Sequence, residues 1–371
     1  MAVTLVKPVG GIFRAQIRYL LVVATAVEII LLGVCFTNNS TDDELNIIPE
    51  PLFTVSTEGI QFQNIIGTED GRIFLAGKDG CLHEVIYSLD QGWFGRRCRR
   101  INLSSSKLNF LLPTMVQNAL WEDDPLAHLA IDNKRNILWT ASEKGSLSLY
   151  DLGVDGKGVT KVSSLSISQI ISSASRAAPQ LDKSNFAPII TVSIIDSGTS
   201  RILHLVAVTA SGIRLYFTAG SSCRPSTVQL SHIRLPPGFT SSTVELKPRK
   251  VHTGLVSGQV SILCSEENGT DYDYMWSLVS MGGTSNLPEE YGVSKLDGRV
   301  WCCAAIDDEV DPLVPTDPEG AINGLSPSRD VCSVYQSPSE FVLMTKQGTA
   351  IYRSLSSAQQ LLQMLKNRFV H

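Results

Sequence analysis

A short pattern of apolar and polar positions recurs along this chain. In each copy, about four apolar residues run into a polar tip, a glycine follows, and a second apolar run leads away. The copies span residues 72–85, 135–149, 201–215, 251–263 and 341–352. The shared glycines are Gly80, Gly145, Gly212, Gly258 and Gly348. A glycine there adopts a positive φ without steric cost and closes a tight hairpin. Five such hairpins predict an array of antiparallel sheets, as in the blades of a β-propeller.

The apolar run over residues 19–36 has two interpretations. Its length suits a transmembrane or signal-anchor helix, and N-glycosylation sequons elsewhere would suit a lumenal domain. The sequons begin at Asn38, Asn39, Asn102 and Asn268. However, Glu28 lies in the middle of the run, where lipid disfavours a charge, and the run is rich in β-branched residues. The run also divides into two apolar stretches around a polar centre, so we predict a sixth hairpin.

The remaining segments carry weaker patterns. Strands are expected at residues 98–103, 126–131, 187–195, 232–235, 273–279 and 299–306. Residues 1–16, 37–58, 151–158 and 307–330 are expected to be irregular or loops, and 104–121 could be strand or helix. Residues 357–370 change to a helical period through Leu361, Leu362, Leu365 and Phe369. Six hairpins correspond to about six blades.

Composition narrows the function classes. Hydrophobic residues make up 43% of the 371 residues and charged residues 18%, so global disorder is excluded. A net charge of -5 argues against broad nucleic-acid binding. The basic cluster Arg96, Arg97, Arg99 and Arg100 is interpreted as a solvated strand end rather than a phosphate site. Eight cysteines without a CxxC pair predict no zinc site and a reducing compartment.

Candidate catalytic groups do not form a recognisable constellation. The six histidines lack HExxH spacing. The acidic run 122–124 before Pro125 is interpreted as a solvated turn, and Gly153, Gly156 and Gly158 lack the strand-to-helix context of a phosphate loop. We therefore predict no catalytic, cofactor-binding or metal-binding residue. A propeller enzyme, with polar residues converging on a central channel, stays open as an alternative.

Residues 163–178 have an amphipathic pattern. The apolar face comprises Leu165, Ile167, Ile170, Ile171, Ala174 and Ala178. The opposite face is almost entirely serine with one charge, Arg176, and Pro179 limits the helix. Bulky apolar residues opposite a charge-poor polar face are typical of helices that bind curved membranes. A flexible Ser-rich loop, or a helix packed on the side of the propeller, is the alternative.

Several stretches resemble one family, the large inner-ring scaffold nucleoporins of the nucleoporin-155 family. They are GRIFLAGKDGCLHEV (71–85), EDDPLAHLAIDNKRNILWTASEKGSLSLYDLG (122–153), GIRLYF (212–217), HIRLPPGF (232–239) and YLLVVATAVEIILLG (19–33). The likeness is colinear over roughly residues 8–365, and it is weaker over 269–330.

The resemblance implies a fold and a function. The family has a seven-bladed propeller followed by an α-helical solenoid, so it implies a propeller over 1–354, incomplete at its N-terminus, and the first solenoid helix over 355–371. It implies a non-enzymatic constituent of the nuclear pore complex at the nuclear envelope that supports nucleocytoplasmic transport of protein and mRNA. The implied partners are other inner-ring and membrane nucleoporins, and the curved pore membrane through residues 163–178, without a cofactor, a specific nucleic acid or a small-molecule substrate. The alternative to this scaffold is a single-pass membrane glycoprotein with an extracellular β domain.

Overall fold

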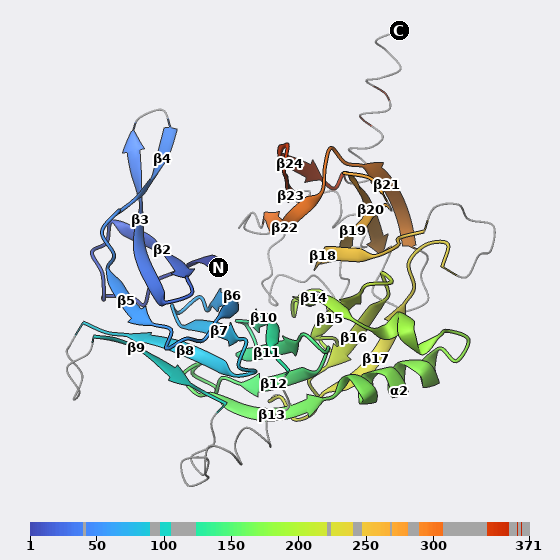
Figure 1. The fold of residues 1–371 in the computed structure, drawn as a ribbon, viewed down its shortest axis with the longest axis horizontal. Helices are drawn as coiled ribbons and strands as arrows, with labels where there is room; N and C mark the ends of the chain where they lie inside the picture. The colour runs from blue at the N-terminus through green and yellow to red at the C-terminus, as the bar shows by residue number, and fades with distance from the viewer. Residues whose placement is uncertain are drawn as a thin grey trace, which may run out of the picture. The chain divides into compact units, whose positions relative to one another are not determined.

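A computed structural model gives the structure of this chain in two compact units, residues Met1–Glu245 and Leu246–His371. The structure describes residues 1–39, 42–89, 97–104, 124–220, 224–239, 247–267, 269–280, 289–306 and 340–355, together with Leu362 and Leu365. The units are described separately (Figure 1).

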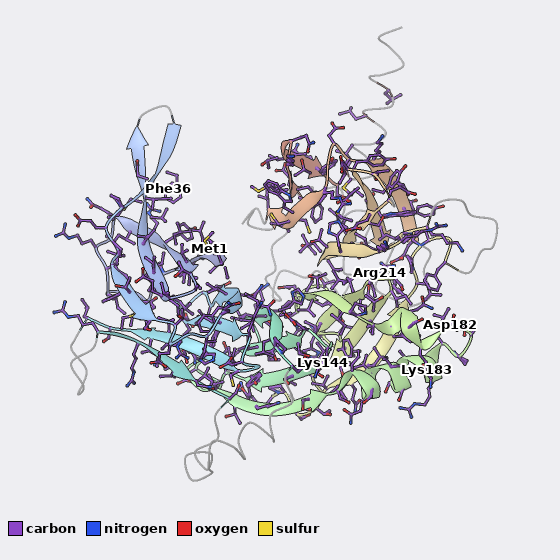
Figure 2. All side chains as sticks on the ribbon, in the orientation of Figure 1. Met1, Phe36, Lys144, Asp182, Lys183 and Arg214 are labelled. Atoms are coloured by element: carbon purple, nitrogen blue, oxygen red, sulfur yellow. The ribbon has the colours of Figure 1, made fainter. Side chains whose placement is uncertain are left out.

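The described residues of the first unit form four antiparallel sheets in chain order and one α-helix. Sheet 1 contains β1 (Ala2–Val6), β2 (Ile17–Ala24), β3 (Glu28–Asn39) and β4 (Asp42–Ile47), and β5 (Phe53–Ser56) pairs with β3. Sheet 2 contains β6 (Phe62–Gly67), β7 (Ile73–Gly77), β8 (Leu82–Tyr87) and β9 (Cys98–Asn102). Sheet 3 contains β10 (Leu126–Asp132), β11 (Ile137–Ser142), β12 (Leu147–Asp151) and β13 (Thr160–Leu165). Sheet 4 contains β14 (Ile189–Ile194), β15 (Leu205–Thr209), β16 (Arg214–Thr218) and β17 (Gln229–Arg234). Between sheets 3 and 4 the chain forms α2 (Ile167–Ala177) and the short 3₁₀-helix η2 (Lys183–Phe186). Asp182 is the N-cap residue of η2, and Lys183 is its first residue (Figure 2).

The described residues of the second unit form two antiparallel sheets. Sheet 5 contains β18 (Val251–Ser257), β19 (Val260–Glu266), β20 (Asp273–Ser280) and β21 (Glu289–Lys295). Sheet 6 contains β22 (Val300–Ile306), β23 (Glu340–Thr345) and β24 (Gly348–Arg353). Each of the six sheets is built on a meander of sequential strands, as in the blade of a β-propeller, and in sheet 1 β5 also returns to pair with β3. The predicted all-β propeller with about six blades is confirmed.

Consecutive sheets share their hydrophobic cores. The core between sheets 3 and 4 contains Trp139 and Leu149 from one sheet and Leu215 and Phe217 from the next, all 0% exposed. Similar shared cores join sheets 1 and 2, sheets 2 and 3, and sheets 5 and 6. In the first unit, the first strands β1, β6, β10 and β14 also lie next to one another in that order. Each sheet therefore buries its faces against its neighbours.

The hairpin tips repeat one hydrogen-bonding pattern. At the β11–β12 tip, the N–H of Ser142 donates to Ser146 O (2.9 Å) and the N–H of Gly145 donates to Ser142 O (2.9 Å). The β7–β8 and β15–β16 tips have the same two bonds. All five tip glycines have positive φ, as the sequence predicted, with +92° at Gly145. A side chain is strained at that angle, which accounts for glycine in each copy.

The apolar run at residues 19–36 forms a strand pair. β2 and β3 are antiparallel, with Leu21 opposite Leu32. One face of this pair, including Leu20 and Leu31, is 0% exposed within the core shared with sheet 2. The predicted sixth hairpin is confirmed, and the membrane alternative for this run is wrong. Among the residues that the structure describes, no helix is long and apolar enough to cross a membrane.

Two of the expected irregular segments contain strands, so those expectations are wrong. Residues 1–16 include β1, which pairs with β2 along its full length. Residues 37–58 include the end of β3, all of β4, and β5. In β4, Leu45 and Ile47 are 50% and 46% exposed, so no alternation between a buried and an exposed face marks this strand in the sequence.

The other segments have mixed outcomes. Strands occur at all six positions where further strands were expected. Most of 104–121 and all of 307–330 lie outside the described residues. Of 357–370, only Leu362 and Leu365 are described, and both are helical. The boundary between residues 354 and 355 stays a prediction.

The tip at Gly145 yields a test of the hairpin pattern. A Cβ at Gly145 would lie 3.0 Å from Cδ1 of Ile167, at a φ of +92°. We expect Gly145→Ala to lower the free energy of unfolding by about 1–3 kcal/mol, measured by urea denaturation. Gly10→Ala is the control, because a Cβ there would meet nothing within 4 Å. Equal stability of the two variants would contradict the proposed role of the tip glycine.

Candidate functional site

Helix α2 contains most of the residues predicted to contact a membrane. It connects β13, the last strand of sheet 3, to sheet 4 (Figure 1). Ile170 and Ala174 are 0% exposed, and Ala178 is 7% exposed. Leu165, Ile167 and Ile171 are half-buried. The structure therefore packs five of the six predicted residues in or against one protein core, and it places Ile167 beside the β11–β12 tip at Gly145.

The covering surface belongs to sheet 4. Ile170, Ala174 and Ala178 are part of the core that contains Phe186 of η2, and Leu230 and Ile233 of β17 pack against this core. Helix α2 lies next to both β17 and η2. Burying an isoleucine side chain contributes about 1.5–3 kcal/mol, so docking stabilises this arrangement. This is the helix packed on the propeller side that the sequence left open.

The ends of α2 are defined by local hydrogen bonds. The hydroxyl of Ser166 accepts from the N–H of Gln169 (3.3 Å), and Oε1 of Gln169 accepts from the N–H of Ser166 (2.9 Å). This reciprocal pair is a capping box. The helix thus begins at Ile167, whereas Ser163 and Leu165 belong to β13. Pro179 follows the C-cap residue Ala178, as predicted.

The solvent-facing side of α2 is polar. Its exposed residues include Ser168, Ser172 and Arg176, and Arg176 is the only charged residue of the helix. The amphipathic pattern read from the sequence is therefore present. In this conformation the exposed side of α2 offers no bulky apolar residue. Contact with a membrane therefore stays a prediction, and it requires α2 to dissociate from sheet 4.

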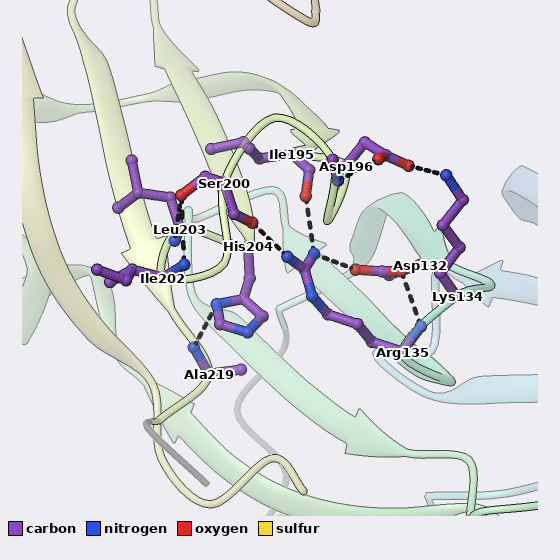
Figure 3. A network of polar contacts seen from close by, with 11 residues as sticks. Asp132, Lys134, Arg135, Ile195, Asp196, Ser200, Ile202, Leu203, His204 and Ala219 are labelled. Carbon is purple, nitrogen blue, oxygen red and sulfur yellow. Dashed lines mark hydrogen bonds and ion pairs between the residues drawn. The ribbon is translucent and has the colours of Figure 1, made fainter. Parts of the chain in front are cut away.

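A second set of functional side chains joins sheet 3 to sheet 4. Arg135, in the turn between β10 and β11, donates to Oδ2 of Asp132 (2.6 Å) and to the carbonyl of Ile195 (2.8 Å). It also donates to the carbonyl of Ser200, so it holds the β14–β15 connection of the next sheet (Figure 3). Asp132 is buried, so this ion pair within sheet 3 is largely desolvated, and the two carbonyl contacts of Arg135 join it to sheet 4.

Arg72 occupies the equivalent turn one sheet earlier. Its guanidinium binds both carboxylate oxygens of Glu84, at 2.7 and 3.0 Å. It also donates to the carbonyls of Gly156 (2.5 Å) and Gly158 (2.9 Å) in the β12–β13 connection. The carbonyls of the Gly-rich loop at 151–158 therefore accept hydrogen bonds from an arginine of the preceding blade. Sequence analysis missed this role, although an arginine begins both the 72–85 and the 135–149 copies.

His204 lies beside the Arg135 network (Figure 3). Its Nδ1 accepts from the N–H of Ala219 (3.2 Å). Burial, and then the nearby charge of Arg135, lower the pKa of His204 below its usual value. The imidazole is therefore neutral near pH 7 and serves as a hydrogen-bond acceptor in the core.

The β7–β8 tip gathers three potential metal ligands. The ligand atoms of Asp79, Cys81 and His83 lie within 4.8 Å of one another. Oδ2 of Asp79 is 2.9 Å from Nε2 of His83, and Nη1 of Arg100 is 2.7 Å from Nδ1 of His83. A guanidinium only donates, so Nδ1 accepts and Nε2 carries the proton that it donates to Asp79.

These contacts do not suit a metal site. Both nitrogens of His83 are already used. Burial raises the pKa of the Cys81 thiol to about 11, whereas a metal-binding cysteine is a thiolate. Burial also raises the pKa of Asp79, but its hydrogen bonds with His83 and with the N–H of Cys81 outweigh that effect, and the net pKa is lowered. The cluster fits a structural role.

The other predicted polar clusters also take part in local contacts. In the basic cluster, Arg97 and Arg99 are exposed, but the side chain of Arg100 is 7% exposed and pairs with Glu58, so the solvated-end interpretation is wrong for Arg100. Arg96, Glu122 and Asp123 lie outside the described residues. Oδ1 of Asp124 accepts from the N–H of Lys144 (3.0 Å), at the β11–β12 tip labelled in Figure 2. The carboxylate of Asp124 therefore caps this tip, but Asp124 is half-buried, so the expected solvated turn is not confirmed there.

Comparison with known proteins identifies the family. The nucleoporin family described as Nup133 N terminal like matches residues 1–351. The chain belongs to this nucleoporin family. It is 30% identical to the nuclear pore complex protein Nup154 of Drosophila melanogaster over 98% of this chain and 28% of that protein. It is 32% identical to nucleoporin NUP170 of Chaetomium thermophilum over 64% of this chain and 18% of that protein.

A solved structure has the same fold as this nucleoporin chain. The crystal structure of the Chaetomium thermophilum Nup170 NTD–Nup53 complex matches 99% of this chain and 54% of that chain, with a TM-score of 0.78 and 24% identity. The present chain thus spans less than a third of the length of the relatives Nup154 and NUP170.

The Arg135 network yields a stability test. Arg135→Met removes one partner of a buried ion pair and leaves Oδ2 of Asp132 and two carbonyls without the guanidinium donor. We expect a loss of about 3–5 kcal/mol in the free energy of unfolding, measured by urea denaturation.

Lys134→Met is the matched control. Lys134 pairs with Asp196 at 2.9 Å, but both side chains are well exposed, so the expected loss is at most about 1 kcal/mol. Similar losses for the two variants would show that Arg135 does not hold the blades together.

Proposed function

We propose that this chain is a structural, non-enzymatic propeller of the nuclear pore scaffold at the nuclear envelope, where it supports nucleocytoplasmic transport. The observation that carries the proposal is the family match over residues 1–351, with similarity to Nup154 along nearly the whole chain. The geometry supports it, because the polar clusters of the described residues are used inside and between blades. Arg72, Arg135 and the Asp79–His83 pair all have protein partners.

Rigid contact between blades suits a docking scaffold. Arg72 and Arg135 each hold a backbone loop of the next sheet. A second tie joins sheets 3 and 4, where Nε of Arg224 donates to Oδ2 of Asp151 (3.1 Å). Loops held in this way lose little conformational entropy when a partner binds. We propose that blade surfaces bind neighbouring nucleoporins, and the Nup170 NTD–Nup53 complex is a precedent in a similar protein.

We further propose that α2 contacts the curved membrane of the pore. The support is the amphipathic helix itself, with a capping box, a serine face and one charge. Weak electrostatic attraction combined with apolar residues favours membranes whose curvature exposes acyl chains. The apolar residues are buried on sheet 4, so this contact requires a conformational change.

Localisation tests the scaffold function. A fluorescent fusion of the full chain is expected to concentrate at the nuclear rim, in register with a pore marker, and to recover slowly after photobleaching because scaffold contacts are long-lived. The fluorescent protein alone is the control. A diffuse distribution equal to that control would contradict the proposal.

A further inference from the structure

The residues proposed to enter a membrane are the residues that attach α2 to the propeller. Ile170 and Ala174 are 0% exposed in the core of sheets 3 and 4. A side chain cannot occupy a protein core and an acyl-chain region at the same time. We propose that docking of α2 on β17 is autoinhibitory, and that membrane binding begins with release of the helix. This inference rests on the proposed membrane contact.

The docked helix exposes no side chains that would bind lipid strongly. The exposed side of the segment presents Ser164, Ser168, Ser172 and Arg176. A single positive charge gives little attraction to an anionic surface, and hydroxyl groups do not fill packing defects between lipids. Affinity therefore depends on the fraction of molecules in which α2 is released.

The contacts of α2 allow release without unfolding of the sheets. Within the described part of the chain, the side chains of 166–177 form hydrogen bonds only with one another and with the cap. The hydroxyl of Ser175 is buried without a hydrogen-bond partner. An unsatisfied buried hydroxyl weakens docking, and release returns it to water.

The chain is anchored on both sides of the helix. Before it, the hydroxyl of Ser163 accepts from the N–H of Val228 (3.3 Å). After it, the carbonyl of Asn185 accepts from the hydroxyl of Thr209 (3.0 Å). These bonds hold β13 and η2 on the sheets. Release of the segment from Ser166 to Asp182 therefore leaves both of its ends in place.

A substitution in β17 tests release of α2 without changing the residues of the helix. Ile233→Ser weakens the β17 side of the contact and leaves the sequence of α2 unchanged. Val279→Ser is the matched control, because Val279 is also half-buried in a strand and packs on the core of sheets 5 and 6. The double variant Ile233→Ser/Ile170→Asn releases the helix but removes a central apolar residue from it.

Two measurements on the full chain test the proposal. Trypsin cleavage after Arg176 reports release, because a docked helical backbone is protected. Flotation with phosphatidylcholine vesicles, small and strongly curved or large, reports membrane binding. Relative to wild type and to Val279→Ser, we expect Ile233→Ser to be cleaved about tenfold faster and to bind small vesicles about tenfold more tightly. The double variant is expected to be cleaved fast and to bind weakly.

Each contrary result has a distinct meaning. If Ile233→Ser is cleaved faster but wild type binds small vesicles equally well, docking does not inhibit and the inference is wrong, while the membrane contact stands. If Ile233→Ser is cleaved faster and binds no vesicle, the membrane contact itself is wrong, and the inference fails with it. Unchanged cleavage of Ile233→Ser would overturn the claim that β17 holds the helix.

Discussion

Burial of sheet faces between neighbouring sheets is the constraint on which this structure depends. A four-stranded meander has too little interior to form a core alone, so its apolar faces must be covered by the next sheet. Trp139 and Phe217, both fully buried, come from sheets 3 and 4 and meet in one core. Stability is thus a property of neighbouring blades rather than of single sheets.

The arginine contacts extend this coupling to the polar edges of the blades. Non-directional apolar packing covers the sheet faces, whereas Arg72 and Arg135 bind particular carbonyl groups of the next blade. A guanidinium has several donors in a fixed plane, so one side chain holds its own turn and a neighbouring loop together. The result is a series of blades with defined orientations within the first unit, which is what a scaffold protein requires.

Sequence patterns predicted the elements whose signals are local. Tip glycines need a positive φ, and paired apolar runs need a partner strand, so the hairpins could be located, including the one at 19–36. β4 was missed because its residues Leu45 and Ile47 are exposed and no face is marked. The role of Arg135 was missed because its partners, Ile195 and Ser200, lie about sixty residues away and are backbone carbonyls, whose identity leaves no trace in sequence. For α2, the period predicted an apolar face but not which surface that face contacts.

The account therefore gives the apolar face of α2 two alternative contacts, with the core of sheets 3 and 4 or with a membrane. Native-state hydrogen exchange measures this balance most directly, because it compares the opening free energy of α2 with that of β15 and β16 in the same molecule. The account predicts that the amides of Ile170 to Ala177 exchange through a local opening that costs less free energy than opening of β15 and β16 and depends weakly on denaturant. Exchange of α2 only together with those strands, with the same free energy and the same denaturant dependence, would contradict a releasable helix.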